Sequence, residues 1–243
     1  MPKRLVRKLD LEMLLSQVEP HPSPKPSLEQ YTIPSDVAAT ILYVAAYMHN
    51  NIVGKTVLDL GCGTGRLALG AAFLGAKEVV GIDIDKTAVK NALRNAKKLG
   101  LRSKVQWVVA DISAVHGDFD VVLQNPPFGV QKRGADRKFI EKALEVGETI
   151  YSLHKHPRTD KKLLKKIKTG KNELIPVFPS PFLEKFIKTR GGEVMAVYAM
   201  AIKIPHMFSF HTKKKHEFIV DLYIIEGSKK LGNQNFRLSR GRF

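Results

Sequence analysis

Apolar and polar positions alternate along this chain in two periods that divide its middle into strands and helices. Short apolar runs predict buried strands at Thr56–Leu60, Glu78–Asp83, 104–109, 121–123 and 149–154. Helical spacing of apolar residues follows several of these runs, for example over residues 86–99, with Asp85 as a candidate cap and Gly100 as the end. Strands that alternate with helices predict a mostly parallel α/β sheet.

The two ends of the chain show other patterns. Apolar residues recur at helical spacing within residues 1–20, which predicts a short amphipathic helix packed on the domain. A further helix is expected to begin with Ser35 as its cap, and two long apolar strands are expected at 193–202 and 216–225. We therefore expect an N-terminal helix and Pro-rich connector (1–27), a main domain (28–226) with a basic insertion (155–181), and a basic tail (227–243).

The first strand contains Asp59 and runs into the turn Gly61-Cys62-Gly63-Thr64-Gly65. Glycines allow the backbone to turn tightly and to approach a ligand closely. The G-x-G-x-G spacing differs from that of dinucleotide folds, which favours a cofactor without a pyrophosphate. Asp83 follows about 20 residues later, where an acid can bind ribose hydroxyls. Asp111-Ile112, after the third strand, is placed to receive an adenine amino group.

The fourth apolar run ends in Asn125-Pro126-Pro127-Phe128, because the two prolines forbid its continuation as a strand. The carbonyl oxygens of Asn125 and Pro126 are hydrogen-bond acceptors, and Phe128 offers a flat apolar face. Two acceptors beside a ring predict a pocket for a planar amine, such as the amino group of a nucleobase. The alternative is a Pro-Pro turn with a core phenylalanine. The upstream glycine turn favours the pocket.

Composition narrows the class of protein. With 44% hydrophobic residues the chain is globular, and no apolar run approaches the ~20 residues of a membrane span. A single cysteine excludes an internal disulfide and a cysteine-rich zinc site, so we expect a cytoplasmic protein without a metal. The net charge of +17 favours a polyanionic partner, for which RNA is the natural candidate.

These motifs together resemble the class I S-adenosylmethionine-dependent methyltransferases that methylate amines. More narrowly, the chain is similar to the methyltransferase-like 5 family, the N6-adenine methyltransferases of small-subunit ribosomal RNA. The narrower resemblance rests on residues 28–32, 151–155, 210–215 and 220–222, and it extends from about residue 28 to residue 225. It implies a Rossmann-like class I fold, with a mostly parallel seven-stranded sheet that ends in an antiparallel hairpin.

The resemblance implies S-adenosyl-L-methionine as the cofactor and an unpaired adenosine of RNA as the substrate. The residues expected to bind the cofactor are Gln30, Tyr31, Thr32, Asp59, Gly61, Cys62, Gly63, Gly65, Asp83, Ile84, Asp111, Ile112 and Asn125. The expected catalytic residues are Asn125, Pro126, Pro127 and Phe128, of which Phe128 would stack on the target base.

Cations cluster late in the chain, which favours contact with an RNA backbone over a merely solvated surface. Residues 161–168 predict a short basic amphipathic helix within the insertion. The residues expected to contact RNA are Lys132, Arg133, Lys155, Lys161, Lys162, Lys165, Lys166, His211, Lys213, Lys214 and Lys215.

The third strand, residues 105–109, would lie at a sheet edge in the strand order of this superfamily, and it carries the only tryptophan, Trp107. Proteins normally cover an exposed apolar edge. The resemblance implies a small methyltransferase-activator subunit there. The alternative is that the N-terminal segment covers the edge.

Other functions remain open at this point. Asn-Pro-Pro-Phe also suits a guanine N2 amine or a glutamine side-chain amide, although the positive charge disfavours a protein substrate. A non-catalytic RNA-binding or ribosome assembly factor is a further alternative, and the complete set of motifs argues against it. The glycine spacing disfavours an NAD-dependent oxidoreductase.

Overall fold

The computed structural model describes residues 5–129, 134–158, 160–169, 174–205 and 215–228, with residues 204, 205, 215 and 216 described by their backbone alone. Its elements are α1 (Lys8–Ser16), η1 (Pro26–Leu28), α2 (Ser35–Tyr43), the π-helical turn η2 (Val44–Met48), β1 (Thr56–Leu60), α3 (Arg66–Leu74), β2 (Glu78–Asp83), α4 (Lys86–Lys98), η3 (Arg102–Lys104), β3 (Gln106–Val109), η4 (Ile112–Ala114), β4 (Phe119–Gln124), α5 (Ala135–Val146), β5 (Gly147–Lys155), α6 (Lys161–Thr169), β6 (Ile175–Pro176), α7 (Pro181–Lys188), β7 (Glu193–Pro205) and β8 (Lys215–Glu226).

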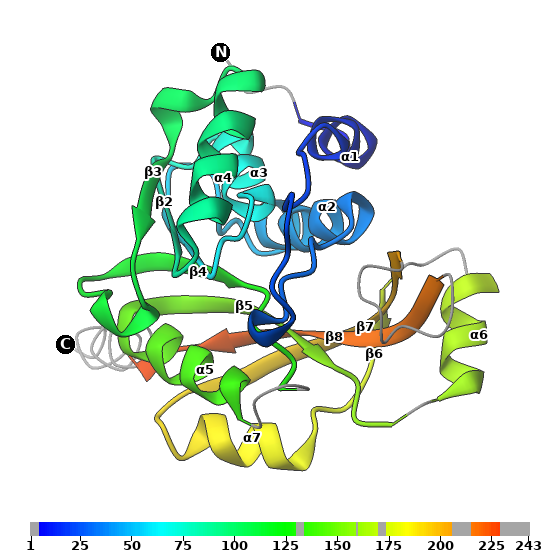
Figure 1. Cartoon of the computed structure of the whole chain (residues 1–243). Coiled ribbons are helices and arrows are strands. Elements are labelled where there is room, and N and C mark those ends of the chain that lie inside the picture. Colours follow the sequence, from blue (N-terminus) through cyan, green and yellow to red (C-terminus); the bar gives the residue numbers. More distant parts are fainter. Residues whose placement is uncertain (1–4, 130–133, 159, 170–173, 206–214, 229–243) are drawn as a thin grey trace.

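The described strands form an eight-stranded sheet in the order β3-β2-β1-β4-β5-β8-β7-β6 (Figure 1). The first five of these strands run parallel, and β8 pairs antiparallel with both β5 and β7. The order reverses between β1 and β4, because the chain moves outward to β2 and β3 before it returns. Open α/β sheets bind ligands at the carboxyl ends of the strands on either side of such a reversal.

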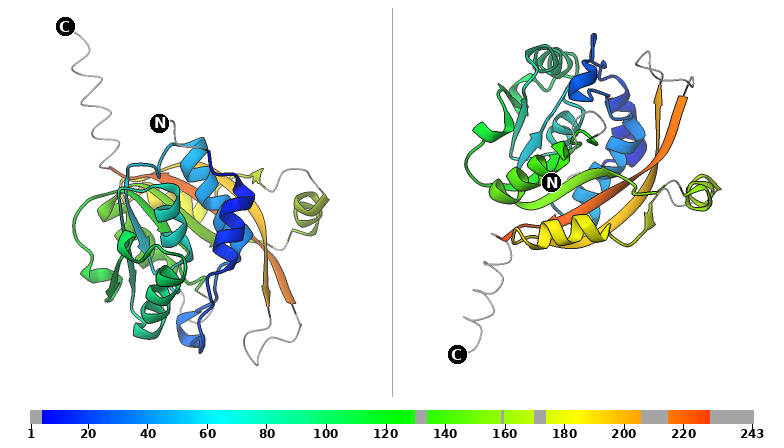
Figure 2. Two further views of the ribbon diagram at one scale, coloured as in Figure 1. Left: turned by 90° about the horizontal axis from the view of Figure 1, so that it is seen from above. Right: turned by 60° about the horizontal axis from the view of Figure 1, so that its bottom comes forward.

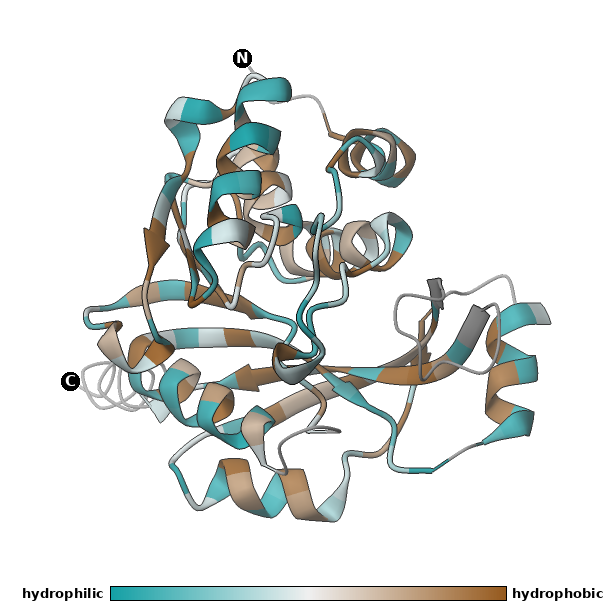
Figure 3. Cartoon of the chain, viewed as in Figure 1, coloured by the Kyte–Doolittle hydropathy of each residue, from teal (hydrophilic) through white to brown (hydrophobic). Residues whose placement is uncertain are grey.

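Helices cover both faces of the sheet (Figure 2). α1, α2 and α3 pack on one face, where Leu11 and Ile41 share a core with Val57 of β1. The next residue of β1, Leu58, faces the opposite core and packs with Ile140 of α5. The outward side of α4 is hydrophilic (Figure 3). None of the described helices combines the length and the apolar character needed to cross a bilayer.

The distal part of the β7–β8 hairpin extends past the neighbouring strands (Figure 2). The described part of the predicted insertion packs on it. The basic amphipathic helix predicted there forms as α6, and Ile167 packs on Ala199 of β7 and Ile219 of β8. Val197, two residues before Ala199, belongs to the core under α5 and α7. Side chains two apart on a strand share a face, so α6 lies on the same side of the sheet as α7.

The sheet has one strand more than the seven predicted. β6 pairs antiparallel with β7 through Ile175 and Pro176. A proline lacks the N–H that a central strand needs, but β6 is an edge strand and needs none on its outer side. Two residues carry no apolar period of their own, so the pattern predicts only an extended stretch there.

The N-terminal helix packs on α2 and α3, as predicted, with Leu11 and Leu15 fully buried. Leu5 and Leu9, expected on the same apolar stripe, are instead 63% and 58% exposed. The predicted cap of α2 is wrong by one residue, because Pro34 occupies the N-cap position.

The strand β3 lies at the sheet edge, as expected, and begins at Gln106. Trp107 turns inward and packs over Gly65 and Gly81. Val108 and Val109 are 40% and 49% exposed, so the described part of the N-terminal segment, which packs on α2 and α3, does not cover this edge.

Candidate functional site

The glycine turn between β1 and α3 is tightly bent and closely packed. Gly61, Gly63 and Gly65 have φ angles of 75°, 54° and 87°, which residues other than glycine rarely adopt. A Cβ atom on Gly61 would lie 2.7 Å from the ring of Phe139, and one on Gly65 would lie 2.5 Å from Trp107. The turn therefore needs glycine at Gly61 and Gly65 because of both their backbone conformation and the packing around them.

Asp59 stabilises this turn through a hydrogen bond with α3. Its side chain is buried, and Oδ2 accepts a hydrogen bond of 2.9 Å from the N–H of Ala68 in α3. Burial, supported by the charge of Asp83, outweighs that hydrogen bond and raises the pKa of the Asp59 carboxyl to about 7. The side chain thus joins the carboxyl end of β1 to the first turn of α3.

Asp83 ends β2 beside the turn. Its Oδ2 accepts from the Gly63 N–H and its Oδ1 accepts from the Asp85 N–H, both at 2.8 Å. Burial raises the pKa of this carboxyl despite the two hydrogen bonds. A carboxylate oxygen has more than one acceptor site, so both oxygens can accept from further donors such as hydroxyls.

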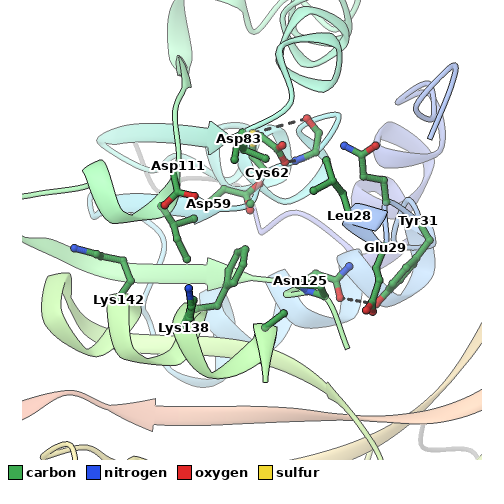
Figure 4. Close-up of a pocket in the computed structure, with 18 of the residues that line it drawn as sticks. Leu28, Glu29, Tyr31, Asp59, Cys62, Asp83, Asp111, Asn125, Lys138 and Lys142 are labelled. Atoms are coloured by element: carbon green, nitrogen blue, oxygen red, sulfur yellow. Dashed lines mark hydrogen bonds between the residues drawn. The ribbon is translucent and has the colours of Figure 1, made fainter. Parts of the chain in front are cut away.

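Two further walls face each other across the pocket (Figure 4). Asp111 precedes η4, and the hydrogen bond from the Ser113 N–H lowers the pKa of its carboxyl. Lys138 and Lys142 come from α5 on the other side. Lys142 donates to the Val115 carbonyl at 3.1 Å and pairs with Glu145 at 2.8 Å.

The connector before α2 is tied over the pocket by Gln30. Its amide donates to Oδ2 of Asp85 at 2.8 Å, and its carbonyl accepts from the Lys25 N–H at 2.9 Å. The imidazole of His21 also lies 3.2 Å from Oδ2 of Asp85. Burial opposes ionisation of Asp85, but hydrogen bonds from Gln30, Thr87 and Lys25 outweigh it and lower the pKa to about 2. Gln30 therefore lines the pocket while both ends of its amide anchor the connector.

Asn125 lies at the opposite end of the pocket from Asp111 (Figure 4). The Tyr31 hydroxyl donates to Oδ1 of Asn125 at 2.9 Å. The Tyr31 ring lies 5.3 Å from the ring of Phe128, which meets Phe218 of β8 edge-on at 5.9 Å. The side-chain oxygen of Asn125 thus lies beside an aromatic cluster formed by Tyr31, Phe128 and Phe218. One acceptor site of this oxygen is used by Tyr31.

These parts enclose a pocket of about 800 Å³, a volume typical of sites for drug-sized and nucleoside ligands. The predicted residues that line it are Gln30, Tyr31, Thr32, Asp59, Gly61, Cys62, Gly63, Asp83, Ile84, Asp111, Ile112, Asn125 and Pro127. Gly65, Pro126 and Phe128 are not among the lining residues. Gly65 caps α3, and Phe128 packs against Tyr31.

Among the described residues predicted to contact RNA, none lines the pocket. Lys155 ends β5, and Lys161, Lys162, Lys165 and Lys166 lie exposed on α6, toward the β6 edge of the sheet (Figure 1). Lys215 is described only as part of the β8 backbone. Lys132, Arg133, His211, Lys213 and Lys214 lie outside the described residues.

Sequence reasoning missed the α5 wall of the pocket, formed by Lys138, Phe139 and Lys142. These residues lie in an ordinary amphipathic helix pattern, and only the three-dimensional fold brings them to the glycine turn. It also missed a buried polar row beside Asn125. The Gln124 amide donates to Ser152 Oγ at 2.8 Å, which lies 2.7 Å from the His154 ring. Burial lowers the pKa of His154 to about 4, so its imidazole is neutral at physiological pH.

No described group of His, Cys, Asp and Glu side chains has the arrangement of a metal site. The chemistry of the site consists of carboxylate and amide acceptors, backbone groups of a glycine turn, and aromatic rings. Such a set fits a polar, nucleoside-containing ligand at one end and a planar amine at the other.

The family, the relatives and the solved structures that this chain resembles agree with one another. A methyltransferase domain family matches residues 52–215. An uncharacterized protein of Methanocaldococcus jannaschii is 40% identical over 240 residues, which cover 94% of this chain and 96% of that protein. The rRNA N6-adenosine methyltransferase of Danio rerio is 33% identical over 217 residues, 87% of this chain and 95% of the relative. A solved structure from Pyrococcus horikoshii, described as a candidate RNA methyltransferase, has a TM-score of 0.75 and 35% identity and covers 92% of this chain and 98% of its own.

Proposed function

The chain belongs to the methyltransferase-like 5 family, and we propose that it methylates the N6 amine of an unpaired adenosine in small-subunit ribosomal RNA. The observation that carries the proposal is the arrangement of the pocket. Asp83 and the glycine turn form one part of it, and Asn125, followed by Pro126, stands at its far end. This separation provides one place for a methyl donor and another for an acceptor amine.

S-adenosylmethionine, when bound, supplies a methyl group activated by a sulfonium centre. The residues of this chain fit such a ligand. The Asp83 carboxylate has acceptor sites for ribose hydroxyls, and Asp111 can accept from the adenine amine. The Gly61–Gly65 turn leaves room for close approach, because a Cβ on Gly63 would meet no atom within 4 Å.

Asn125 and Pro126 serve the acceptor amine. An exocyclic adenine amine is a poor nucleophile, because its lone pair is delocalised into the ring. Two carbonyl acceptors would bind both amine hydrogens and localise the lone pair toward the methyl donor. No strong base is needed, because the N–H becomes acidic only after transfer. Positioning of this kind contributes several kcal/mol, roughly, to lowering the barrier.

The target base stacks on the aromatic cluster of Phe128 in this proposal. A base must leave its neighbours to enter the pocket, at roughly a few kcal/mol, least when it is already unpaired. Phosphates of the same RNA would contact the exposed lysines of α6. Among the described residues, no acid forms an ion pair with Lys161, Lys162, Lys165 or Lys166, so their charges are available to a polyanion.

The exposed edge of β3 supports a second part of the proposal, a small activator subunit that adds a strand there. Val108 and Val109 are exposed on an edge that no described strand pairs with. A strand from a partner would pair the free backbone groups and cover both valines.

The test is methyl transfer from labelled S-adenosylmethionine to small-subunit ribosomal RNA that lacks the modification, followed by nucleoside mass spectrometry. It is run with and without the activator subunit, and with Val108→Lys and Val109→Lys variants. We expect label in N6-methyladenosine, and activator-dependent stimulation that both lysine variants abolish. Label in N2-methylguanosine would contradict the adenine assignment. Cofactor binding without transfer to any RNA would contradict the RNA substrate. Failure to bind the cofactor would leave the assembly-factor alternative.

A further inference from the structure

Phe178, in the segment between β6 and α7, is the most exposed large hydrophobic side chain among the described residues. It is 95% exposed, and Phe182, at the start of α7, is 59% exposed. Both belong to a short aromatic and proline-rich segment, Val177-Phe178-Pro179-Ser180-Pro181-Phe182. A phenylalanine that is almost fully exposed contributes little to folding through burial, and exposed rings within one short segment form an apolar patch of the kind that marks an interaction site.

The backbone on both sides of Phe178 is anchored. The Val177 N–H donates to the Val197 carbonyl of β7 at 3.0 Å, and the Ser180 N–H donates to the Tyr223 hydroxyl of β8 at 2.7 Å. The Val177 side chain packs against the core under α7 and also against the core under α6. Pro179 restricts the segment further. The fold therefore anchors the backbone on both sides of Phe178 and leaves its ring exposed.

Phe182 continues the aromatic row toward the first turn of α5, whose neighbouring residues Gly134 and Ala135 line the pocket. Its ring stacks on Phe186 with centroids 6.2 Å apart, and the Arg137 guanidinium lies 5.7 Å from its centroid. Arg137 is in the first turn of α5, which follows Asn125 along the chain. α5 and α7 lie side by side on this face of the sheet (Figure 1). Phe178 and Phe182 are four residues apart, at most about 14 Å between Cα atoms.

The elements that precede and follow the row in the chain are mainly basic. Lys155 and Arg158 are exposed in the segment that leaves β5, and the lysines of α6 lie beyond them. α7 carries Lys185 and Lys188 against a single acid, Glu184. Exposed rings among cations match the way single-stranded nucleic acids are bound, with bases stacked on rings and phosphates beside positive charges.

We propose that Phe178 and Phe182 are stacking platforms for unpaired bases that flank the target nucleotide of an RNA strand. The proposal rests on the RNA substrate proposed above and adds a path for the strand, from the Asn125 end of the pocket across α7 toward α6. Stacking needs only the π face of a base, so these two positions bind without reading sequence.

The test measures the affinity of a fluorescently labelled single-stranded RNA for Phe178→Ala, Phe178→Leu and Phe178→Trp, each alone and combined with Phe182→Ala. Phe73→Ala is the matched control, because Phe73 is also exposed but lies on α3, across the sheet. Each lost platform is expected to weaken binding roughly tenfold, and the tryptophan variant should bind like the wild type. A duplex of the same sequence should bind all variants equally.

A leucine at position 178 that binds the single strand as tightly as phenylalanine would overturn the proposal, because leucine keeps the apolar bulk without the ring. Equal losses for single strand and duplex would also overturn it. So would a loss of self-association in the alanine variants at unchanged RNA affinity, which would make the row a protein contact. If the wild type methylates RNA and the variants match it in RNA affinity, only the stacking platforms are wrong. If the wild type neither binds nor methylates RNA, the proposed function itself is wrong.

Discussion

At the scale of single residues, the Tyr31 hydroxyl determines how the Asn125 amide faces the pocket. It donates to Oδ1 of Asn125 at 2.9 Å, and burial raises the pKa of the hydroxyl well above its ordinary value, so it stays a donor at physiological pH. The donor orients the amide and leaves the oxygen a second acceptor site for a substrate amine. Tyr31 therefore acts as a positioning residue for Asn125.

Tyr31→Phe removes this hydrogen bond and keeps the ring against Phe128. We expect kcat to fall roughly 2- to 10-fold, the value of one such hydrogen bond, with the cofactor Kd within about twofold of wild type. Single-turnover methyl transfer and equilibrium cofactor binding measure the two quantities. Tyr47→Phe is the control, because it loses a hydroxyl that accepts from the Val6 N–H in the N-terminal segment. Equal effects of the two substitutions would show that Tyr31 has only a structural role.

Asp59 gives the second prediction at this scale, through the pH dependence of stability. Burial raises the pKa of its carboxyl from 3.8 to about 7, so the folded state holds a proton that the unfolded state releases between these values. The contribution of Asp59 to stability is therefore complete below pH 4 and is lost as pH rises toward 7. The full range corresponds to roughly 4 kcal/mol, at ~1.4 kcal/mol per pH unit.

Asp59→Asn should remove this loss. Urea unfolding between pH 4 and pH 7 should show that stability of the variant falls less over this interval than that of the wild type. Asp120→Asn is the matched control, because hydrogen bonds from Thr56 outweigh burial and lower the pKa of Asp120, which gives a pH dependence of the opposite sign. Parallel curves for wild type and Asp59→Asn would contradict the raised pKa.

Residues differ in how far their roles were predictable. Asp83 is the last residue of its strand and Asn125 directly follows one, so the motif around each fixes its place at the carboxyl edge of the sheet, and both line the pocket. Lys138 and Phe139 reach the same pocket from a helix more than 70 residues after the glycine turn. Their contact depends on how α5 packs, which no local pattern contains. The aromatic row of Phe178 and Phe182 was missed for a similar reason, because an apolar segment ordinarily predicts burial.

At the scale of elements, α6 presents its lysines away from the pocket, where we propose that they contact RNA. The helix attaches through Ile167 to the distal β7–β8 hairpin and exposes its lysines. The apolar spacing within the basic run was enough to predict the helix. The position of α6 at the far side of the sheet was not predictable, because it depends on how far β7 and β8 extend beyond the neighbouring strands.

Replacement of Lys162, Lys165 and Lys166 by glutamine keeps helix propensity and removes three charges from α6. We expect RNA affinity to fall about tenfold or more at low salt, and the slope of log K against log salt to decrease in magnitude by about 2. Cofactor affinity should not change. The control replaces the exposed Lys90, Arg94 and Lys97 of α4 by glutamine, on the opposite face of the sheet. Equal losses in both triple variants would mean that only the net charge matters.

At the scale of the whole molecule, the fold divides its sheet into two parts. The parallel strands from β3 to β5 form the pocket at the β1–β4 reversal, and the long β7–β8 hairpin carries α6 away from it. The parallel part was predictable, because strand and helix periods alternate there with clear ends. The added strand β6 was not, because a two-residue pairing is decided by the neighbour and not by its own sequence.

The effect of the net charge of +17 depends on where the charged residues lie in this fold. The pocket at the β1–β4 reversal is lined by Asp59, Asp83 and Asp111. The cations of α6 lie away from it, toward the β6 edge of the sheet. We expect a polyanion to contact the hairpin side, while the pocket offers these acids, beside Lys138 and Lys142, to a ligand with hydroxyl and amine donors.

In the proposed mechanism Asn125 acts on the acceptor amine and not on the cofactor, and the Asn125→Ala variant separates these two roles. The measurement is single-turnover methyl transfer to ribosomal RNA by the variant, together with its Kd for S-adenosylmethionine. We predict that transfer falls at least about hundredfold while the Kd stays within about twofold of wild type. Asp83→Ala should show the reverse order, with cofactor affinity lost first. Transfer that persists in Asn125→Ala, or a cofactor affinity that is lost with it, would contradict this account.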